Sequence, residues 1–131
     1  MNNEGLKPRT RRFGIKVIEF VGLFPRNIVG KTIGTQLLRS GTSVGANYRS
    51  ACRARSRADF ISKIQIAEEE SDECEYWLDL ATSANLGDHR MRDWLAREAG
   101  ELTAILAQSA ITAKHGEQRD HRRRSRQTSP H

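Results

Sequence analysis

Six carboxylates crowd into residues 68–75, and they are the first candidates for metal chemistry. They are Glu68, Glu69, Glu70, Asp72, Glu73 and Glu75. A di-iron helix bundle would need Glu-x-x-His on two helices, with further carboxylates facing them. The segment around these acids contains no His, and His89, His115, His121 and His131 fall at expected helix ends or in the tail. We therefore predict a structural or solvated acidic face, no metal or other cofactor, and no enzymatic activity.

The second candidate site is the stretch RSGTSVGANY, residues 39–48, whose glycines, hydroxyl residues and Asn are typical of turns. A phosphate-binding P-loop would need G-x-x-x-x-G-K-[ST] after a strand. Gly41 and Gly45 are too close together for this motif, and no Lys follows them. Apolar residues continue at helical spacing through the stretch without a change of phase. This pattern predicts one helix over residues 33–55 rather than a loop or a break.

Basic residues supply the strongest functional signal. Residues 1–58 contain twelve Lys or Arg and two acids, whereas residues 59–79 contain eight acids and one Lys. On a helical wheel, the predicted 33–55 helix carries a basic stripe opposite its core face, and the tail adds RRRSR. No acid lies within residues 20–58 to neutralise this stripe, and no aromatic residues alternate with it, which favours phosphate contact without sequence recognition. The predicted nucleic-acid-binding residues are Lys31, Arg39, Arg49, Arg53, Arg55, Arg57, Arg122, Arg123 and Arg124.

Four segments with helical periodicity position these residues, and no segment alternates as a strand would. They run from about Thr10 to Phe24, from about Gly30 to Arg55, from Ser56 or Asp59 to Asn85-Leu86-Gly87, and from Asp88 to Lys114-His115-Gly116. Short connections predict an all-α, antiparallel up-down-up-down four-helix bundle over residues 10–115. We expect the polar, basic residues 116–131 to form a disordered tail. The alternative is two helical hairpins that complete their core with another chain.

Two further stripes raise the question of subunit contacts. In the second segment, small residues lie beside the core face, where they suit either tight packing inside the bundle or contact with another subunit. In the third segment, a Trp and two aliphatic residues follow a second seam with two glutamates, which would need hydrogen-bond donors such as Ser43, Asn47 or the arginines. The predicted subunit interface comprises Gly34, Leu38, Gly41, Gly45, Ile66, Glu70, Glu73, Trp77 and Leu80.

The block RSGTSVGANYRSACRARSRADFISKIQIAEEESDECEYWL closely resembles the signature of the 23S rRNA intervening-sequence four-helix-bundle proteins. The resemblance implies an antiparallel four-helix bundle that assembles into a homopentameric ring, and nucleic-acid binding is the usual conjecture for this family. The chain is similar, more distantly, to the accessory variability determinants of diversity-generating retroelements, which bind nucleic acid and a reverse transcriptase. It departs from the family pattern at Glu68-Glu69-Glu70 and in its Arg-rich tail. The matching positions include Arg39, Ser40, Gly41, Ser43, Gly45, Ala46, Asn47, Tyr48, Ala51, Arg53, Ser56, Phe60, Lys63, Glu70, Glu73, Tyr76, Trp77 and Leu78.

The cysteines and the apolar pattern suggest a cytoplasmic, soluble protein. Cys52 and Cys74 have no metal-ligand spacing, and we expect both to be buried thiols. The N-terminal residues lack the apolar core of a signal peptide, and no apolar run is long enough to span a membrane. We expect neither a membrane partner nor a small-molecule substrate. Two functions remain open: a homo-oligomer, with a pentamer suspected, that binds nucleic acid with RNA as the expected polymer, or an assembly scaffold for a protein partner such as a reverse transcriptase.

Overall fold

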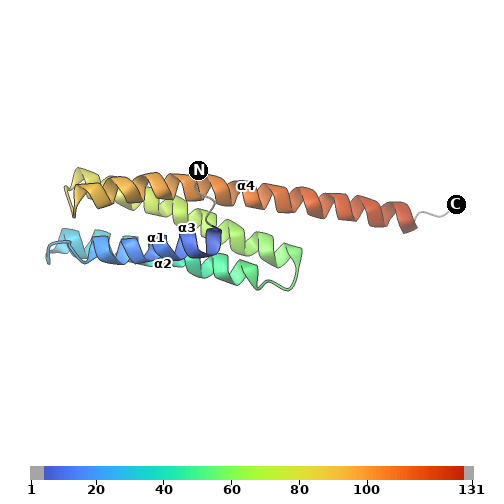
Figure 1. Ribbon diagram of the computed structural model, residues 1–131, viewed down its shortest axis with the longest axis horizontal. Coiled ribbons are helices and arrows are strands. Elements are labelled where there is room, and N and C mark those ends of the chain that lie inside the picture. The colour runs from blue at the N-terminus through green and yellow to red at the C-terminus, as the bar shows by residue number, and fades with distance from the viewer. Residues whose placement is uncertain (1–4, 129–131) are drawn as a thin grey trace.

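The computed structural model describes residues 5–128, which form four helices joined by short connections (Figure 1). The helices are α1 (Leu6–Val21), α2 (Ile28–Cys52), α3 (Arg57–Ser83) and α4 (His89–Thr128). Consecutive helices run in opposite directions and pack side by side, and α1 also contacts α4. Residues 5–128 contain no strand, so the predicted all-α four-helix bundle is confirmed at this level. None of the four helices, over the described residues, is both long and apolar enough to cross a membrane.

Local side-chain chemistry sets the helix ends. The side chain of Asn27 accepts from the Gly30 amide, Ser56 Oγ accepts from the Asp59 amide, and Asp88 Oδ2 accepts from the Met91 amide. These bonds satisfy amides that have no partner within the first turn of a helix. Of the two starts predicted for the third helix, Ser56 rather than Asp59 is the cap, and Asp88 caps α4 at its predicted start. The predicted stop after α3 is also confirmed, because Asn85 and Gly87 adopt positive φ angles of 52° and 70°.

The stretch RSGTSVGANY lies inside α2, so the prediction of one continuous helix is confirmed, although α2 ends at Cys52 rather than at Arg55. The hydroxyl groups bond within the helix: Ser40 Oγ donates to Gln36 O at 2.9 Å and Ser43 Oγ to Arg39 O at 2.7 Å. The glycines permit close contact with α1. A Cβ atom at Gly41 would lie 2.7 Å from Val17 Cγ2, a distance at which side chains clash.

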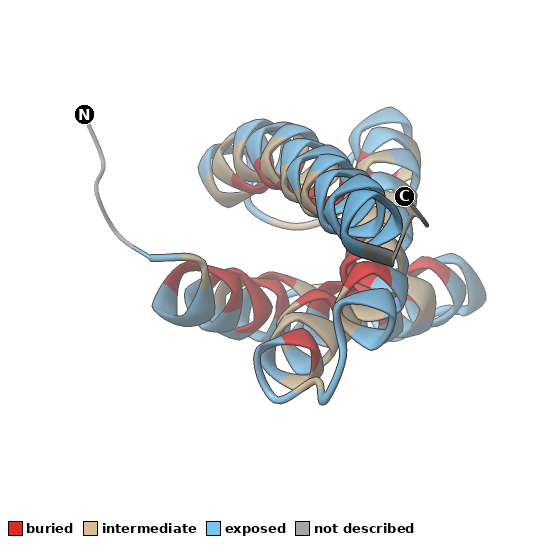
Figure 2. Ribbon diagram, turned by 90° about the vertical axis from the view of Figure 1, so that its right-hand side faces the viewer, coloured by how far each residue is buried: buried red, intermediate tan, exposed pale blue. Residues whose placement is uncertain are grey.

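The core runs between the four helices as a continuous apolar layer (Figure 2). Each helix contributes residues at helical spacing, so its buried side faces the bundle and its other side faces solvent. The largest fully buried apolar side chains are Phe13, Val17, Phe20, Leu37, Val44, Ile64, Leu78, Leu95, Leu102 and Leu106. The expectation of two buried cysteines is half wrong: Cys74 is buried, but Cys52 is exposed at the end of α2, and both thiols are free.

The last helix is much longer than predicted. Helix α4 continues to Thr128, so the predicted end at Lys114-His115-Gly116 is wrong, and residues 116–128 are helical where disorder was expected. Predicted tail residues 129–131 lie outside the described part of the chain. Ala110 is the last buried residue of α4. The following residues 111–128, named here the α4 extension, run past the start of α3, and their last part projects beyond the end of the bundle (Figure 1).

Candidate nucleic-acid interface

Two antiparallel helices bring four basic residues to one surface. Lys7 and Arg11 lie one turn apart near the start of α1, and Arg49 and Arg53 lie one turn apart at the end of α2. Residues spaced i, i+4 share a helix face, so each pair presents its charges in the same direction. Together they line a groove of about 530 Å³, named here the α1/α2 basic groove. Its other lining residues are Thr10, Gly14, Ile15, Ile18, Thr42, Gly45 and Ala46.

Acids of the described part of the chain do not pair with the charges of this groove. Within residues 5–128, none of its four basic side chains forms an ion pair with an acid. A neighbouring hollow adds Arg55 beside Arg49 and Arg53, with Asp59 as its acidic lining residue. The floor of the groove is partly apolar, since the side chains of Ile15 and Ile18 are 37% and 54% exposed. The surface therefore combines unpaired cations with a shallow apolar strip.

The residues predicted to bind nucleic acid do not all lie together in the structure. Arg49, Arg53 and Arg55 lie together at the basic end of α2. Lys31 lies near the other end of the same helix, roughly five turns away. Arg57 lies at the start of α3 and donates from Nη1 to Asp120 Oδ2 at 2.5 Å. Lys31 and Arg57 are therefore not part of the groove.

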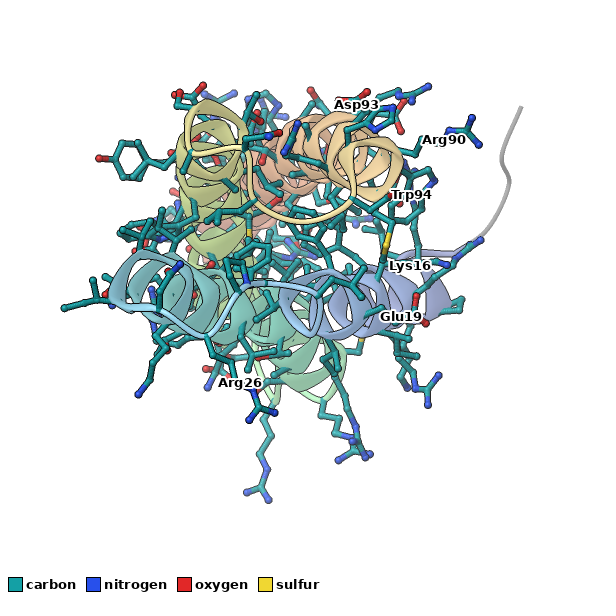
Figure 3. The ribbon with its side chains drawn as sticks, turned by 90° about the vertical axis from the view of Figure 1, so that its left-hand side faces the viewer. Lys16, Glu19, Arg26, Arg90, Asp93 and Trp94 are labelled. Carbon is teal, nitrogen blue, oxygen red and sulfur yellow. The ribbon has the colours of Figure 1, made fainter. Side chains whose placement is uncertain are left out.

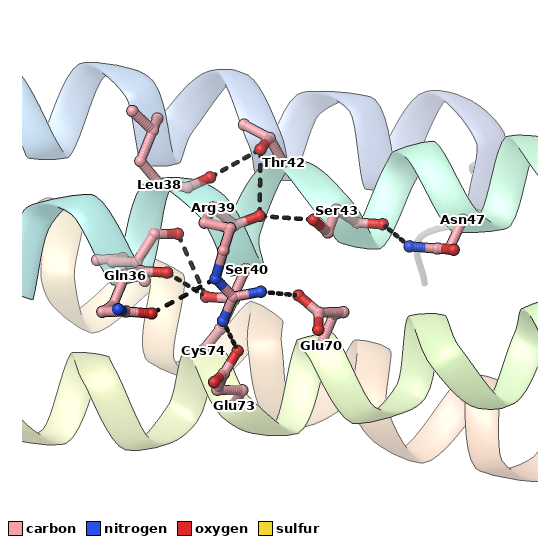
Figure 4. Close-up of polar contacts among 11 residues, drawn as sticks. Gln36, Leu38, Arg39, Ser40, Thr42, Ser43, Asn47, Glu70, Glu73 and Cys74 are labelled. Atoms are coloured by element: carbon pink, nitrogen blue, oxygen red, sulfur yellow. Dashed lines mark hydrogen bonds and ion pairs between the residues drawn. The ribbon is translucent and has the colours of Figure 1, made fainter.

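Arg39 is held by acids of the same chain (Figure 4). Its Nη1 donates to Glu70 Oε2 at 3.0 Å and its Nη2 donates to Glu73 Oε2. The hydrogen bond that Arg39 donates to Glu73 is the main cause that raises the pKa of Arg39 above its usual value. The prediction that Glu70 and Glu73 need donors from α2 is confirmed, with Arg39 as the donor. Ser43 and Asn47, the other expected donors, bond instead to backbone carbonyl groups of α2.

Part of the predicted subunit interface packs against α1 inside the bundle. A Cβ atom at Gly34 would meet Val21 Cγ1 at 3.1 Å, and one at Gly45 would meet Thr10 O at 3.2 Å. The three glycines of this prediction therefore face α1, as expected for tight packing inside the bundle, and their contact with another subunit stays a prediction. Leu38 and Ile66 remain 38% exposed. Trp77 and Leu80 are partly buried and pack against the core.

Lys7 and Arg11 were absent from the predicted site. The sequence places them at i, i+4 spacing, but the helix was expected to begin at Thr10, which left Lys7 outside it. Helix α1 begins at Leu6 instead. The tail arginines are also arranged differently from the prediction. Arg122 and Arg123 line one surface of the α4 extension with Arg119 and Arg126, whereas Arg124 is not part of that lining.

Comparisons with known proteins agree with this architecture. The model of the 23S rRNA-intervening sequence protein family matches residues 7–108, which include the α1/α2 basic groove but not the α4 extension. A solved structure from Bacteroides thetaiotaomicron, described as a protein with unknown function from the S23 ribosomal protein family, is 31% identical and superposes with a TM-score of 0.71. That match covers 81% of this chain and 98% of the Bacteroides chain. A search of curated proteins found no match. The chain belongs to the 23S rRNA-intervening sequence protein family.

Proposed function

We propose that the protein is a non-enzymatic nucleic-acid-binding protein that contacts phosphate groups through the α1/α2 basic groove, with RNA as its polymer. The single observation that carries this proposal is the convergence of Lys7, Arg11, Arg49 and Arg53 on one surface without a described acidic partner. Guanidinium and ammonium groups in such a cluster attract phosphates and release the counterions bound to them. Base recognition is not part of the proposal, because no aromatic side chain lines the groove.

Fluorescence anisotropy tests this proposal. A labelled RNA hairpin and a DNA duplex are titrated with the protein at several salt concentrations. The logarithm of the affinity should fall linearly with the logarithm of the salt concentration, with a slope of roughly 0.7 to 0.9 per neutralised phosphate. Arg49→Gln together with Arg53→Gln should lower this slope by about 2 and weaken binding.

Arg39→Gln is the matched control for this experiment. It removes one charge from the same helix, but its guanidinium is already paired with Glu70 and Glu73. The control should bind RNA with the affinity of the wild type. Absence of wild-type binding even at low salt, or equal losses per charge from Arg39 and from the groove residues, would refute the proposed site.

We further propose that the chain forms a homo-oligomer, with the pentamer that the family resemblance implies. Support comes from the exposed aliphatic side chains Leu38 and Ile66 on α2 and α3. Repetition of the basic groove around a ring would join weak phosphate contacts into tighter binding through a high effective concentration. Light scattering coupled to size-exclusion chromatography measures the assembly. Leu38→Glu with Ile66→Glu should reduce the measured mass, and an unchanged mass would show that these residues lie outside any subunit contact.

The apolar strip in the groove favours a second candidate function. Ile15 and Ile18 could bind an acidic, amphipathic segment of a protein partner, with the four cations around it binding the acids. If variants of the groove residues bind RNA as tightly as the wild type does, the scaffold function is favoured instead.

A further inference from the structure

The α4 extension carries a second basic surface that the bundle does not use. Ala110 is the last buried residue of α4, and residues 111–127 are exposed except for the half-buried Ala113 and Gly116. The extension contains six Lys or Arg and two acids, and it has no Phe, Tyr or Trp. It also lies outside the region that matches the family model, which ends at residue 108. The charge of this segment therefore needs an explanation separate from the family fold.

Four arginines share one face of this helix. Arg119, Arg122, Arg123 and Arg126 follow i, i+3, i+4 and i+7 spacing, which places them within a sector of about 100°. They line one surface hollow together with Gln127, and none of them forms an ion pair with a described acid. Arginines at this spacing form a row of cations that could bind a row of phosphates.

An ion pair joins the extension to the start of α3. Asp120 lies about 100° around the helix from the centre of the arginine face and accepts from Arg57 at the start of α3. A Cβ atom at Gly116 would lie 3.3 Å from Nη1 of the same Arg57 side chain. The start of α3 follows directly after Arg53 and Arg55, so this ion pair lies at the basic end of the bundle (Figure 1).

We propose that the α4 extension binds across the major groove of double-stranded RNA, with the four arginines contacting phosphates of both strands. This inference rests on the proposed function, because the extension and the α1/α2 basic groove would contact the same RNA. A duplex is favoured over a single strand because the extension has no aromatic side chain on which bases could stack.

The positions of the acids favour RNA over DNA. If the helix entered the roughly 12 Å wide major groove of B-form DNA, Glu117 and Asp120 on its other sides would approach the phosphates of the groove walls. If the helix instead lies over a groove without entering it, only its arginine face approaches the phosphates. The major groove of A-form RNA is deep and narrow, so the two phosphate rows lie close enough for one arginine face to reach both.

Paired glutamine variants test the extension with a control of equal charge. Arg122→Gln with Arg123→Gln removes two charges from the arginine face. Arg26→Gln with Arg90→Gln removes two charges at the opposite end of the bundle, where both side chains point away from the helices (Figure 3). Gln is a good helix former, and far-UV circular dichroism checks that α4 keeps its helical content. Each protein is titrated with an RNA duplex of about 20 base pairs, one of its single strands, and a DNA duplex of the same sequence.

The extension variant should bind duplex RNA about tenfold more weakly than the wild type, with a salt slope lower by about 2. The control variant should bind like the wild type, and wild-type affinity should be highest for duplex RNA. Equal losses in both variants, equal losses on the single strand, or tighter wild-type binding to duplex DNA would each overturn the inference. If the extension variant binds like the wild type while Arg49→Gln with Arg53→Gln weakens binding, the inference fails and the proposed function stands. If the wild type binds no RNA, both fail.

Discussion

The Arg39 guanidinium joins α2 to α3 by donating to Glu70 and Glu73 at once. All three side chains are partly exposed, so solvent and salt screen their attraction. A single cation shared by two carboxylates still fixes the side chains of both acids. Arg39 is thereby a contact between helices, although its place on the wheel of α2 resembles that of the unpaired arginines.

Removal of the Glu73 carboxylate should have a small, salt-dependent effect on stability. Glu73→Gln keeps an acceptor for Arg39 but loses the charge, so the melting temperature should fall slightly at low salt. The difference from the wild type should shrink as salt is added, because salt screens exposed pairs. Differential scanning calorimetry at two salt concentrations measures this. A difference that grows with salt would contradict an ionic role for the pair.

The two thiols should differ strongly in reactivity. Cys74 is buried and donates to Ser40 Oγ at 3.3 Å, and burial raises its pKa to about 12. Only about one molecule in ten thousand would then carry the reactive thiolate at pH 8. Cys52 is exposed at the end of α2. A disulfide reagent should therefore modify one thiol quickly and the second after unfolding, and Cys52→Ser should remove the fast reaction. Two fast reactions in the folded protein would show that Cys74 is accessible.

At the scale of the helices, α1 is tied to α4 by a nearly buried charge network. Arg9 Nε donates to Glu98 Oε2 at 2.8 Å, and its Nη2 donates to Glu98 Oε1 and to Glu101 Oε2. The side chains of Arg9 and Glu98 are 9% and 12% exposed. The hydrogen bond from Arg9 lowers the pKa of Glu98. Such paired, desolvated charges are costly to separate.

This network should make stability depend on pH in the acid range. Because the pKa of Glu98 is lower in the folded state, its stabilisation is complete above the unfolded value of about 4.3 and is lost as the pH falls through the folded value. Glu98→Gln should lower the free energy of unfolding at pH 7 by about 1.5–3 kcal/mol. Urea denaturation from pH 7 to pH 3 measures both proteins. The variant should lose less stability than the wild type over that range, and parallel curves would exclude Glu98 as the source.

The elements differ in how far the sequence alone could predict them. Helix α2 was predictable, because its apolar phase continues through Gly41 and Gly45, and hydroxyl groups that resemble turn residues bond within the helix. The length of α4 was not, since residues 116–128 have no apolar periodicity and are held near their base by a long-range ion pair between Arg57 and Asp120. Local sequence patterns do not show which residues distant in the sequence will form ion pairs.

The candidate site required the packing of two helices to be known. Arg49 and Arg53 were predicted from α2 alone, but Lys7 and Arg11 join them only because α1 runs antiparallel beside α2. The same packing covers the glycines that were assigned to a subunit contact. Net charge on a helix face was therefore a good guide to the region of the site, and a poor guide to which cations remain unpaired.

At the scale of the whole molecule, the two proposed binding surfaces lie near each other. The basic groove, the turn between α2 and α3, and the α4 extension all lie toward one end (Figure 1). Farther along the bundle, Arg39 pairs with Glu70 and Glu73 of α3. An RNA bound at the basic end would meet cations from three helices and few acids. The position at which RNA binds on the molecule is therefore the property to measure.

Site-directed photo-crosslinking tests that position most directly. Cys52 lies next to Arg53 and is exposed, whereas Cys74 is buried, so a thiol-linked photo-crosslinker attaches beside the groove without further mutation. The matched control carries Cys52→Ser with Thr32→Cys, which moves the crosslinker to an exposed position near the other end of α2. With a labelled RNA hairpin at moderate salt, the crosslinker at residue 52 should yield a covalent protein–RNA product, and Arg49→Gln with Arg53→Gln should suppress it. Equal or greater yield from residue 32 would contradict binding at the α1/α2 basic groove.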